Sequence, residues 1–272
     1  MFDVVTCGFT AARVRAHPAH SDVRELPAPT AADFLDRGHD LLATCDDARP
    51  LLFVHAAHPA SRRRVATLRA TVRTPTMAVG FGRPLTGLAA VATWLSSLAA
   101  RDVPVGLATG HTLDRHAALL PTYVVTSSVA GVDLPFVRLT HHLLSWLPGT
   151  MFTIGLDEHP RITTGRVAAS FPQAEGTDLV VAGSARLAER LSAATPANVV
   201  ERYEAPGPVD SAPGGPVAWG RARFFEQTAL PRSVDQTVSE IEARGAVRCA
   251  QCAEPSLATS CPFCSAREGL YL

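Results

Sequence analysis

Short apolar runs that alternate with stretches of helical periodicity are the feature that most constrains the fold of this chain. Such alternation is typical of strands connected by crossover helices. It predicts an α/β fold with a mostly parallel sheet and flanking helices. The expected strands cover residues 4–7, 51–55, 76–81, 105–109, 123–126, 151–154 and 179–182. The expected helices cover residues 61–73, 85–100, 136–147 and 233–244.

Proline and glycine concentrate in residues 205–217, and this composition predicts a linker. The chain of 272 residues is therefore expected to have three parts. An α/β domain covers residues 1–204, the linker follows, and residues 218–272 form a smaller module. We expect a helix in this module, followed by a small C-terminal zinc ribbon.

Charge and composition exclude several classes of function. Basic and acidic residues balance at 25 each, so the sequence carries no strong signal for nucleic-acid binding. Lysine is absent from the sequence, which excludes Schiff-base catalysis and a Walker A phosphate loop. The N-terminus does not resemble an export signal, and no run of about 18 apolar residues occurs. We expect a cytoplasmic protein without a membrane segment.

Four cysteines near the C-terminus have the spacing of metal ligands. Cys249 and Cys252 form one Cys-x-x-Cys pair, and Cys261 and Cys264 form a second pair eight residues later. Two such pairs supply the four thiolates of a tetrahedral structural zinc site. Disulfides, free thiols and an iron or redox centre are the alternatives. The spacing resembles that of short zinc ribbons, which implies a metal-held fold used for protein contacts, nucleic-acid contacts or stabilisation.

Two histidines follow the ends of expected strands. His55 ends the strand at 51–55, and His111 follows the strand at 105–109. Open α/β sheets bind ligands beyond the carboxyl ends of their strands. If these strands are neighbours, both histidines face one crevice as metal ligands or as an acid–base pair. The alternative is a pair of ordinary loop histidines.

A third strand end carries Ser127 and Ser128. Ser128 is a candidate nucleophile if a histidine lies within hydrogen-bond reach. No Gly-x-Ser-x-Gly elbow surrounds it, and a serine-rich turn is the alternative.

Two family resemblances concern the same residues. The order of strands, turns and helices over residues 51–121 resembles half of a class II tetrapyrrole chelatase of the sirohydrochlorin or cobalt type. That resemblance implies a metal-insertion site at His55 and His111. Residues 94–131 are similar to caspase-like peptidases of the CHAT type, with His111 near the histidine turn of that family. The cysteine of that family is missing, because Ser128 or Val129 stands at its place.

Two functions remain open from the sequence. The first is a zinc-binding recognition or adaptor component that works with a protein partner, which the predicted ribbon favours. The second is a chelatase-like or hydrolase-like enzyme with His55 and His111 in a site at the carboxyl edge of the sheet, which the histidines favour.

Overall fold

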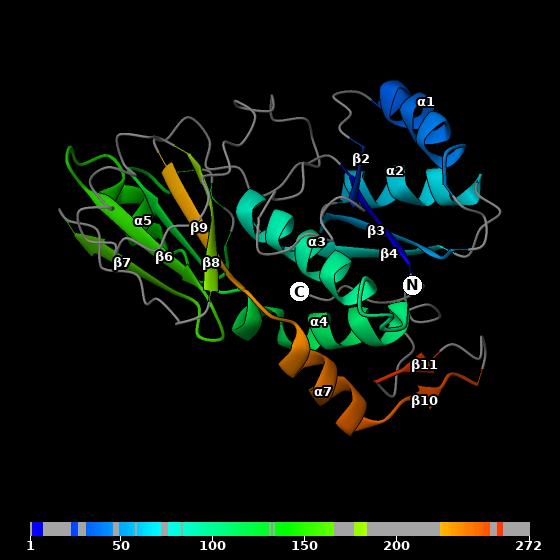
Figure 1. Cartoon of the computed structure of the whole chain (residues 1–272). Coiled ribbons are helices and arrows are strands. Elements are labelled where there is room, and N and C mark those ends of the chain that lie inside the picture. The colour runs from blue at the N-terminus through cyan, green and yellow to red at the C-terminus, as the bar shows by residue number, and fades with distance from the viewer. Residues whose placement is uncertain are drawn as a thin grey trace.

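The described residues form two large β-sheets with a long helix between them, and a small third sheet of two strands (Figure 1). The structure is a computed structural model. It describes residues 2–7, 23–26, 31–45, 49–57, 59–71, 76–82, 84–130, 132, 134–165, 177–183, 224–250 and 255–257.

The first sheet is parallel and has the strand order β2-β1-β3-β4. Its strands are β1 (Asp3–Cys7), β2 (Val23–Leu26), β3 (Leu51–Ala56) and β4 (Thr76–Phe81). Helices α1 (Ala31–Leu42) and α2 (Pro59–Ala70) cover one face, where Phe53 packs with Val65 and Leu68. On the opposite face, Leu52 and Val54 pack against the central helix. The sheet is therefore buried on both sides, as parallel sheets usually are.

Helix α3 (Leu85–Ala99) is the central element, and every residue from Thr86 to Ala99 is buried. One side of α3 packs against the first sheet, and another side contacts Val180 and Leu230 of the second sheet. The helix has no charged residue and is covered from two directions. Two of its hydroxyl groups bond within the helix, since Thr93 donates to the Ala89 carbonyl at 3.0 Å and Ser97 to the Thr93 carbonyl at 2.9 Å.

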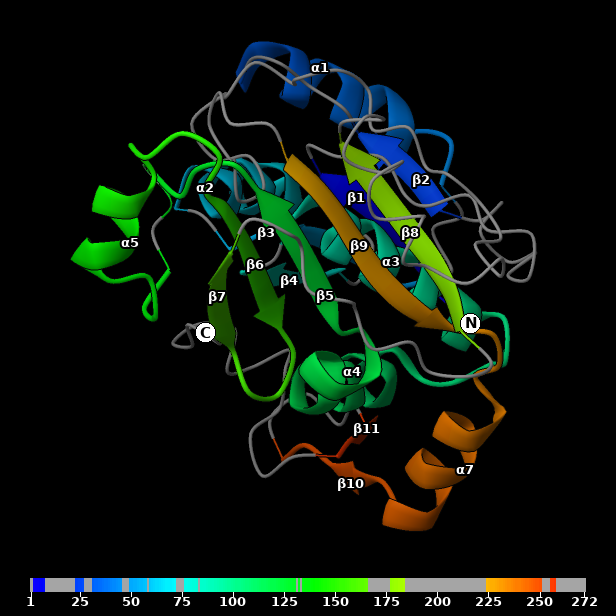
Figure 2. The ribbon, with the colours of Figure 1, turned by 90° about the vertical axis from the view of Figure 1, so that its left-hand side faces the viewer.

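The second sheet is antiparallel and has the order β7-β6-β5-β9-β8. Its strands are β5 (Thr122–Thr126), β6 (Met151–Leu156), β7 (Arg161–Gly165), β8 (Thr177–Gly183) and β9 (Phe224–Pro231). Figure 2 shows this sheet in front of α3. The expected α/β class is confirmed, but the expectation of one mostly parallel sheet is wrong, because the second sheet contains only antiparallel pairs among its described strands.

Helix α4 (Val105–Leu119) replaces the strand expected at residues 105–109. A short apolar run has the same pattern in a buried strand and in a buried helix, so periodicity could not decide between them. Pro104 occupies the N-cap, where its missing N–H group costs no helical hydrogen bond. The apolar run is therefore the first part of a longer helix, and the interpretation of His111 changes with it.

The remaining elements lie at the periphery. Helix α5 (Leu139–Leu144) is shorter than the expected helix and leaves Leu139, Leu143 and Trp146 exposed. Helix α7 (Asp235–Arg244) packs against α4, and β10 (Val247–Arg248) pairs with β11 (Pro255–Ser256). No helix among the described residues has the length and apolar character needed to cross a membrane.

The three predicted parts of the chain stay a prediction, and the linker at residues 205–217 lies outside the described residues. Strand β9, which follows the linker in sequence, pairs with β5 on one side and with β8 on the other. The smaller C-terminal part therefore contributes a strand to the middle of the second sheet.

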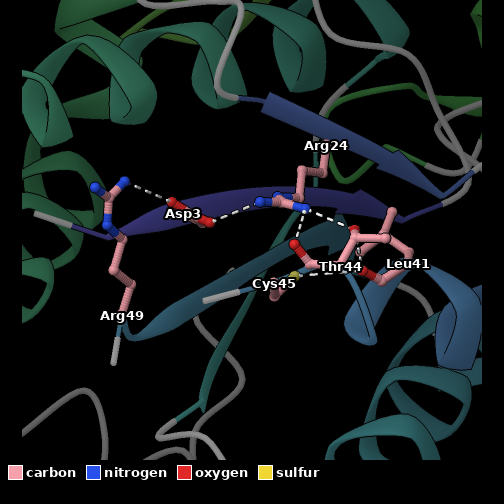
Figure 3. Close-up of polar contacts among 6 residues, drawn as sticks. All are labelled: Asp3, Arg24, Leu41, Thr44, Cys45 and Arg49. Carbon is pink, nitrogen blue, oxygen red and sulfur yellow. Dashed lines mark hydrogen bonds and ion pairs between the residues drawn. The ribbon is translucent and has the colours of Figure 1, made fainter. Parts of the chain in front are cut away.

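An ion-pair network stabilises the N-terminal end of β1 (Figure 3). The buried carboxylate of Asp3 lies 3.4 Å from the Arg24 guanidinium and 3.8 Å from that of Arg49. Arg24 also donates to the Thr44 hydroxyl at 2.8 Å and to the Thr44 carbonyl at 3.2 Å. Arg24 thus connects β1, β2 and the segment after α1, whereas Arg49 is more exposed and makes the longer contact.

We predict that Arg24→Ala destabilises the protein by about 1 to 3 kcal/mol, because it leaves a buried carboxylate with a weaker partner. Arg49→Ala removes the same charge from a more exposed pair and is expected to cost less than about 1 kcal/mol. Urea unfolding of the two variants measures the difference. Equal losses would show that the Arg49 contact is as important as the contacts of Arg24.

Candidate functional site

His55 lies at the carboxyl end of β3, and its place on that strand agrees with the sequence prediction. From β1 the chain continues to β2 on one side, and the later strands β3 and β4 lie on the other side. The switch point of the sheet is therefore between β1 and β3, where Cys7 pairs with His55. His55 is only 4% exposed, and its Nδ1 donates to the Ala56 carbonyl at 2.7 Å. A methyl group added at Gly80 would lie 2.8 Å from His55 Cε1, so glycine is needed for the close packing of β4.

The protonation state of His55 follows from this environment. Burial lowers the pKa of His55, and the nearby Arg62 and Arg69 guanidinium groups lower it further against the effect of the Ala56 hydrogen bond. The ring is therefore neutral near pH 7. Because Nδ1 carries the proton that is donated to Ala56, Nε2 carries the lone pair and can only accept a hydrogen bond.

A buried polar cluster lies where the first turn of α3 meets the second sheet. Glu226 on β9 is 1% exposed, and its Oε1 accepts a hydrogen bond from the Thr86 backbone N–H at 3.0 Å. The first N–H groups of a helix have no partner within the helix, and its N-terminus carries a partial positive charge. The Glu226 carboxylate therefore satisfies a backbone group that would otherwise be available to an external anion.

Three threonine hydroxyls continue this cluster across the sheet. Thr86 Oγ1 lies 2.9 Å from Thr228 Oγ1, which lies 2.8 Å from Thr122 Oγ1. Thr122 in turn donates to the Leu120 carbonyl at 3.4 Å. Each hydroxyl has one hydrogen, and either member of each pair can be the donor.

The polar cluster borders an apolar region on the same face of the second sheet. Directly paired residues of antiparallel strands point to one face, and Val124 pairs with both Glu226 and Ile154. Val124, Ile154 and Phe152 form a buried cluster with Val129 and Val132. An apolar surface beside a few polar groups is the usual composition of a small-molecule site.

The sequence did not identify Glu226, Thr86, Thr122 and Thr228 as site residues. The available signal was the sequence Phe-Phe-Glu-Gln-Thr-Ala-Leu at residues 224–230. As a strand, it places Glu226, Thr228 and Leu230 on one face, which is an unusual position for an acidic residue.

His111 lies in the interior of α4, and its side chain is fully buried. Its Nε2 is 3.3 Å from Glu240 Oε2 on α7, and its buried Nδ1 has no hydrogen-bond partner in the described structure. Burial lowers the pKa of His111 more than the Glu240 hydrogen bond raises it. His55 and His111 thus have different partners, on β3 and on α7, instead of facing a common crevice between two strand ends.

Ser128 lies in the turn after β5. Its Oγ accepts a hydrogen bond from the Ala130 N–H at 3.1 Å, and its backbone bonds twice with the Thr126 hydroxyl. These contacts define a serine turn of the kind that the sequence offered as the alternative. A nucleophilic role for Ser128 remains only a prediction.

The described residues give no support to the predicted zinc ribbon. Cys249 is half-buried beside the β10–β11 pair, whereas Cys252, Cys261 and Cys264 lie outside the described residues. Within the described ranges, no group of three or more histidine, cysteine, aspartate or glutamate side chains could hold a metal ion.

Comparison with known proteins relates the fold to a group of lipid-binding structures. No family model and no curated protein matches the chain. A stearic acid-binding protein from Eubacterium ventriosum shares 9% identity, and the match covers 85% of this chain and 99% of that one with a TM-score of 0.55. A fatty acid-binding DegV family protein from Thermus thermophilus shares 12% identity over the same fractions, with a TM-score of 0.54. A Thermotoga maritima protein with fatty acid binding function also shares 12% identity over 85% and 99%, with a TM-score of 0.52.

These similarities correct the family resemblances and the functions inferred from them. The solved neighbours are neither chelatases, nor CHAT peptidases, nor zinc ribbons. Because their similarity extends over both sheets, the resemblance of residues 51–121 to a chelatase half and of residues 94–131 to a peptidase is wrong. The zinc cofactor, the zinc-binding adaptor and the enzyme with His55 and His111 in one site are therefore also wrong. The chain shares the fold of these fatty acid-binding proteins.

We predict that the protein loses stability as the pH falls below about 6.5, the ordinary pKa of histidine. The folded-state pKa values of His55 and His111 are lowered, so the folded protein binds fewer protons than the unfolded chain in this range. The contribution of the two neutral histidines to the free energy of unfolding is therefore complete above about pH 6.5. It is lost as the pH falls towards their lowered pKa values in the folded protein. Protonation of His111 would also place an unpaired N–H at its buried Nδ1.

Thermal unfolding at about pH 7.5 and about pH 5.5 measures this dependence. His111→Gln should reduce the difference between the two melting temperatures, whereas His159→Gln, at an exposed position in the turn after β6, should preserve it. A His111→Gln variant with the full wild-type pH dependence would contradict the prediction.

Proposed function

We propose that the protein binds a long-chain fatty-acyl ligand in the region where α3 meets the second sheet. The observation that carries this proposal is the shared fold, which extends over 85% of the chain to proteins that bind stearic acid or other fatty acids. The similarity includes both sheets, and a ligand between them would contact elements from each half of the fold.

The composition of this region supports the proposal. A fatty-acyl ligand needs a long apolar surface for its chain and a few polar groups for its head. The cluster around Phe152 and Ile154 offers the first, and the adjoining Thr86, Thr228 and Glu226 offer the second. In this proposal the acyl chain lies against the apolar cluster, and the head group lies near the first turn of α3.

Further expectations from the sequence belong to the proposal. A cytoplasmic location is consistent with the lack of a membrane-spanning helix among the described residues. A protein partner, to which an acyl-binding protein would deliver or from which it would receive its ligand, stays a prediction. We assign no chemical reaction to the site.

We predict that the purified protein contains bound acyl lipid, which organic extraction and mass spectrometry will identify. Three isoleucines report where added stearate binds, because the sequence contains only Ile154, Ile162 and Ile241. Ile154 lies in the apolar cluster, Ile162 packs against it, and Ile241 lies on α7. The methyl NMR signals of Ile154 and Ile162 should shift, while that of Ile241 should stay in place.

Two outcomes would contradict this function. One is an extract without acyl lipid together with stearate that moves none of the three methyl signals. The other is a shift confined to Ile241, which would place the lipid in the core cluster of α3 and α7 instead of at the apolar cluster of Phe152 and Ile154.

A further inference from the structure

We propose that two copies of this chain associate through their β7 strands, so that the second sheet continues from one copy into the other and the exposed side chains of α5 are covered. The surface consists of β7 (Arg161–Gly165) and of four exposed apolar side chains on α5 and the turn after it. These side chains are Leu139, Leu143, Trp146 and Leu147. The inference does not rest on the proposed function, because it concerns an edge of the sheet and needs no bound lipid.

Strand β7 is an exposed edge of the second sheet. Among the described strands only β6 pairs with it, in a continuous register from Arg161 to Gly165, and four of its five residues are exposed. An exposed edge is a template for pairing with another chain, which natural proteins usually prevent with a lysine, a proline or a bulge. Strand β7 contains none of these. Its one charged residue, Arg161, is paired with Asp157 of the same chain at 2.9 Å.

Strand β7 can pair with its own copy without opposing like charges. An antiparallel pair centred on Thr163 uses all five residues of each strand. Thr163 then lies opposite Thr163 of the second copy, and Ile162 lies opposite Thr164. Arg161 lies opposite Gly165, so the two guanidinium groups are at opposite ends of the pair. Threonine and other β-branched pairs stabilise antiparallel strands, whereas like charges directly opposite each other destabilise them.

Two five-residue strands alone are too small for a stable interface, because such interfaces bury about 1,200–2,000 Å². Helix α5 supplies further surface near the same edge. The His141 ring lies edge-on to the Phe152 ring with centroids 6.5 Å apart, and Phe152 pairs with Thr164 of β7. Figures 1 and 2 both show α5 and β7 on the same side of the second sheet. A two-fold axis at the β7 pair therefore brings the α5 helices of both copies to one face of the joined sheet.

The outer side of α5 has the composition of an interface. Leu139 and Leu143 are one helical turn apart, and the Trp146 N–H continues the turn by donating to the Leu143 carbonyl at 3.1 Å. Trp146 is 83% exposed. The inner side of the helix is already used, since Leu144 packs against the apolar cluster around Phe152. Contiguous exposed apolar side chains mark interaction sites, and tryptophan is among the residues that contribute most to interfaces.

A second copy fits this surface better than a membrane does. Helices that lie on an anionic membrane usually carry several lysines and arginines beside their apolar face. Residues 134–156 contain no lysine and one arginine, Arg138. A bilayer also offers no backbone groups to pair with β7, whereas a second copy offers an identical strand.

Sedimentation of the wild-type protein at concentrations up to about 0.1 mM tests the association. We expect the mass to rise with concentration from the 28.8 kDa of one chain towards twice that value. A protein that stays monomeric over this range would overturn the proposal. Binding of such a monomer to phosphatidylglycerol vesicles would assign the exposed face of α5 to a membrane instead.

Opposite charges at Thr163 test the partner and the register together. Thr163→Lys and Thr163→Glu each place like charges opposite each other, and we expect each to raise the dissociation constant of the dimer by about tenfold or more. An equimolar mixture of the two variants should dimerise again, because lysine then lies opposite glutamate. Thr67→Lys is the matched control, since it adds the same charge at an exposed position on α2 and should leave dimerisation unchanged.

Two results with these variants would contradict the β7 pair. One is a Thr163→Lys protein that dimerises as the wild type does, and the other is a mixture that stays as monomeric as each variant alone. Trp146→Ser tests the contribution of α5, and we expect it to weaken the dimer as well. An unchanged dissociation constant for Trp146→Ser would exclude α5 from the interface and overturn the proposal as stated. The sedimentation of the wild-type protein decides the question if a variant does not fold.

Discussion

The structure depends on the burial of α3 from two directions. Helix α3 contains no charged residue, so covering only one of its sides would leave large apolar side chains in water. The burial of such side chains is the main favourable term in folding. The first sheet covers one side of α3, and β8 and β9 cover another. Trp94, Leu95 and Leu98 are fully buried as a result. The position of each sheet is therefore set by a shared helix, and the two sheets cannot separate without exposing it.

This arrangement also determines the chemistry available between the sheets. The end of a buried helix cannot be hydrated as an exposed one is, so its unpaired N–H groups need partners from the protein or a ligand. The second sheet supplies one such partner in Glu226, two residues before Thr228 on the same face of β9. The polar cluster around Glu226 thus forms because the second sheet covers the first turn of α3. It lies beside the apolar cluster around Phe152 and Ile154 on the same sheet.

Local pattern predicted three of the four strands of the first sheet and helix α2, whereas β2 and α1 were not predicted. The limits of β4 were predicted in full, and α3 was predicted to within one residue. The helix at residues 105–119 was missed because its first five residues are equally compatible with a buried strand. That error moved His111 from the inside of a helix to a supposed strand end and created an apparent pair with His55. The contact of Glu226 with Thr86 could not be predicted, since it joins residues 140 positions apart and depends on how the second sheet is assembled.

The place of β9 in the second sheet has a consequence for how the chain folds during its synthesis. Ribosomes release the N-terminal part of a protein first, and the parallel sheet with α1 and α2 can form from residues made early. The partner of Thr122 on β9 is Thr228, 106 positions later. Until that strand emerges, the side of α3 that faces the second sheet has no cover, and contacts between distant residues form slowly. The nascent protein therefore presents an apolar helix surface for much of its translation, and chaperones that bind such surfaces should associate with it until residue 231 has left the ribosome.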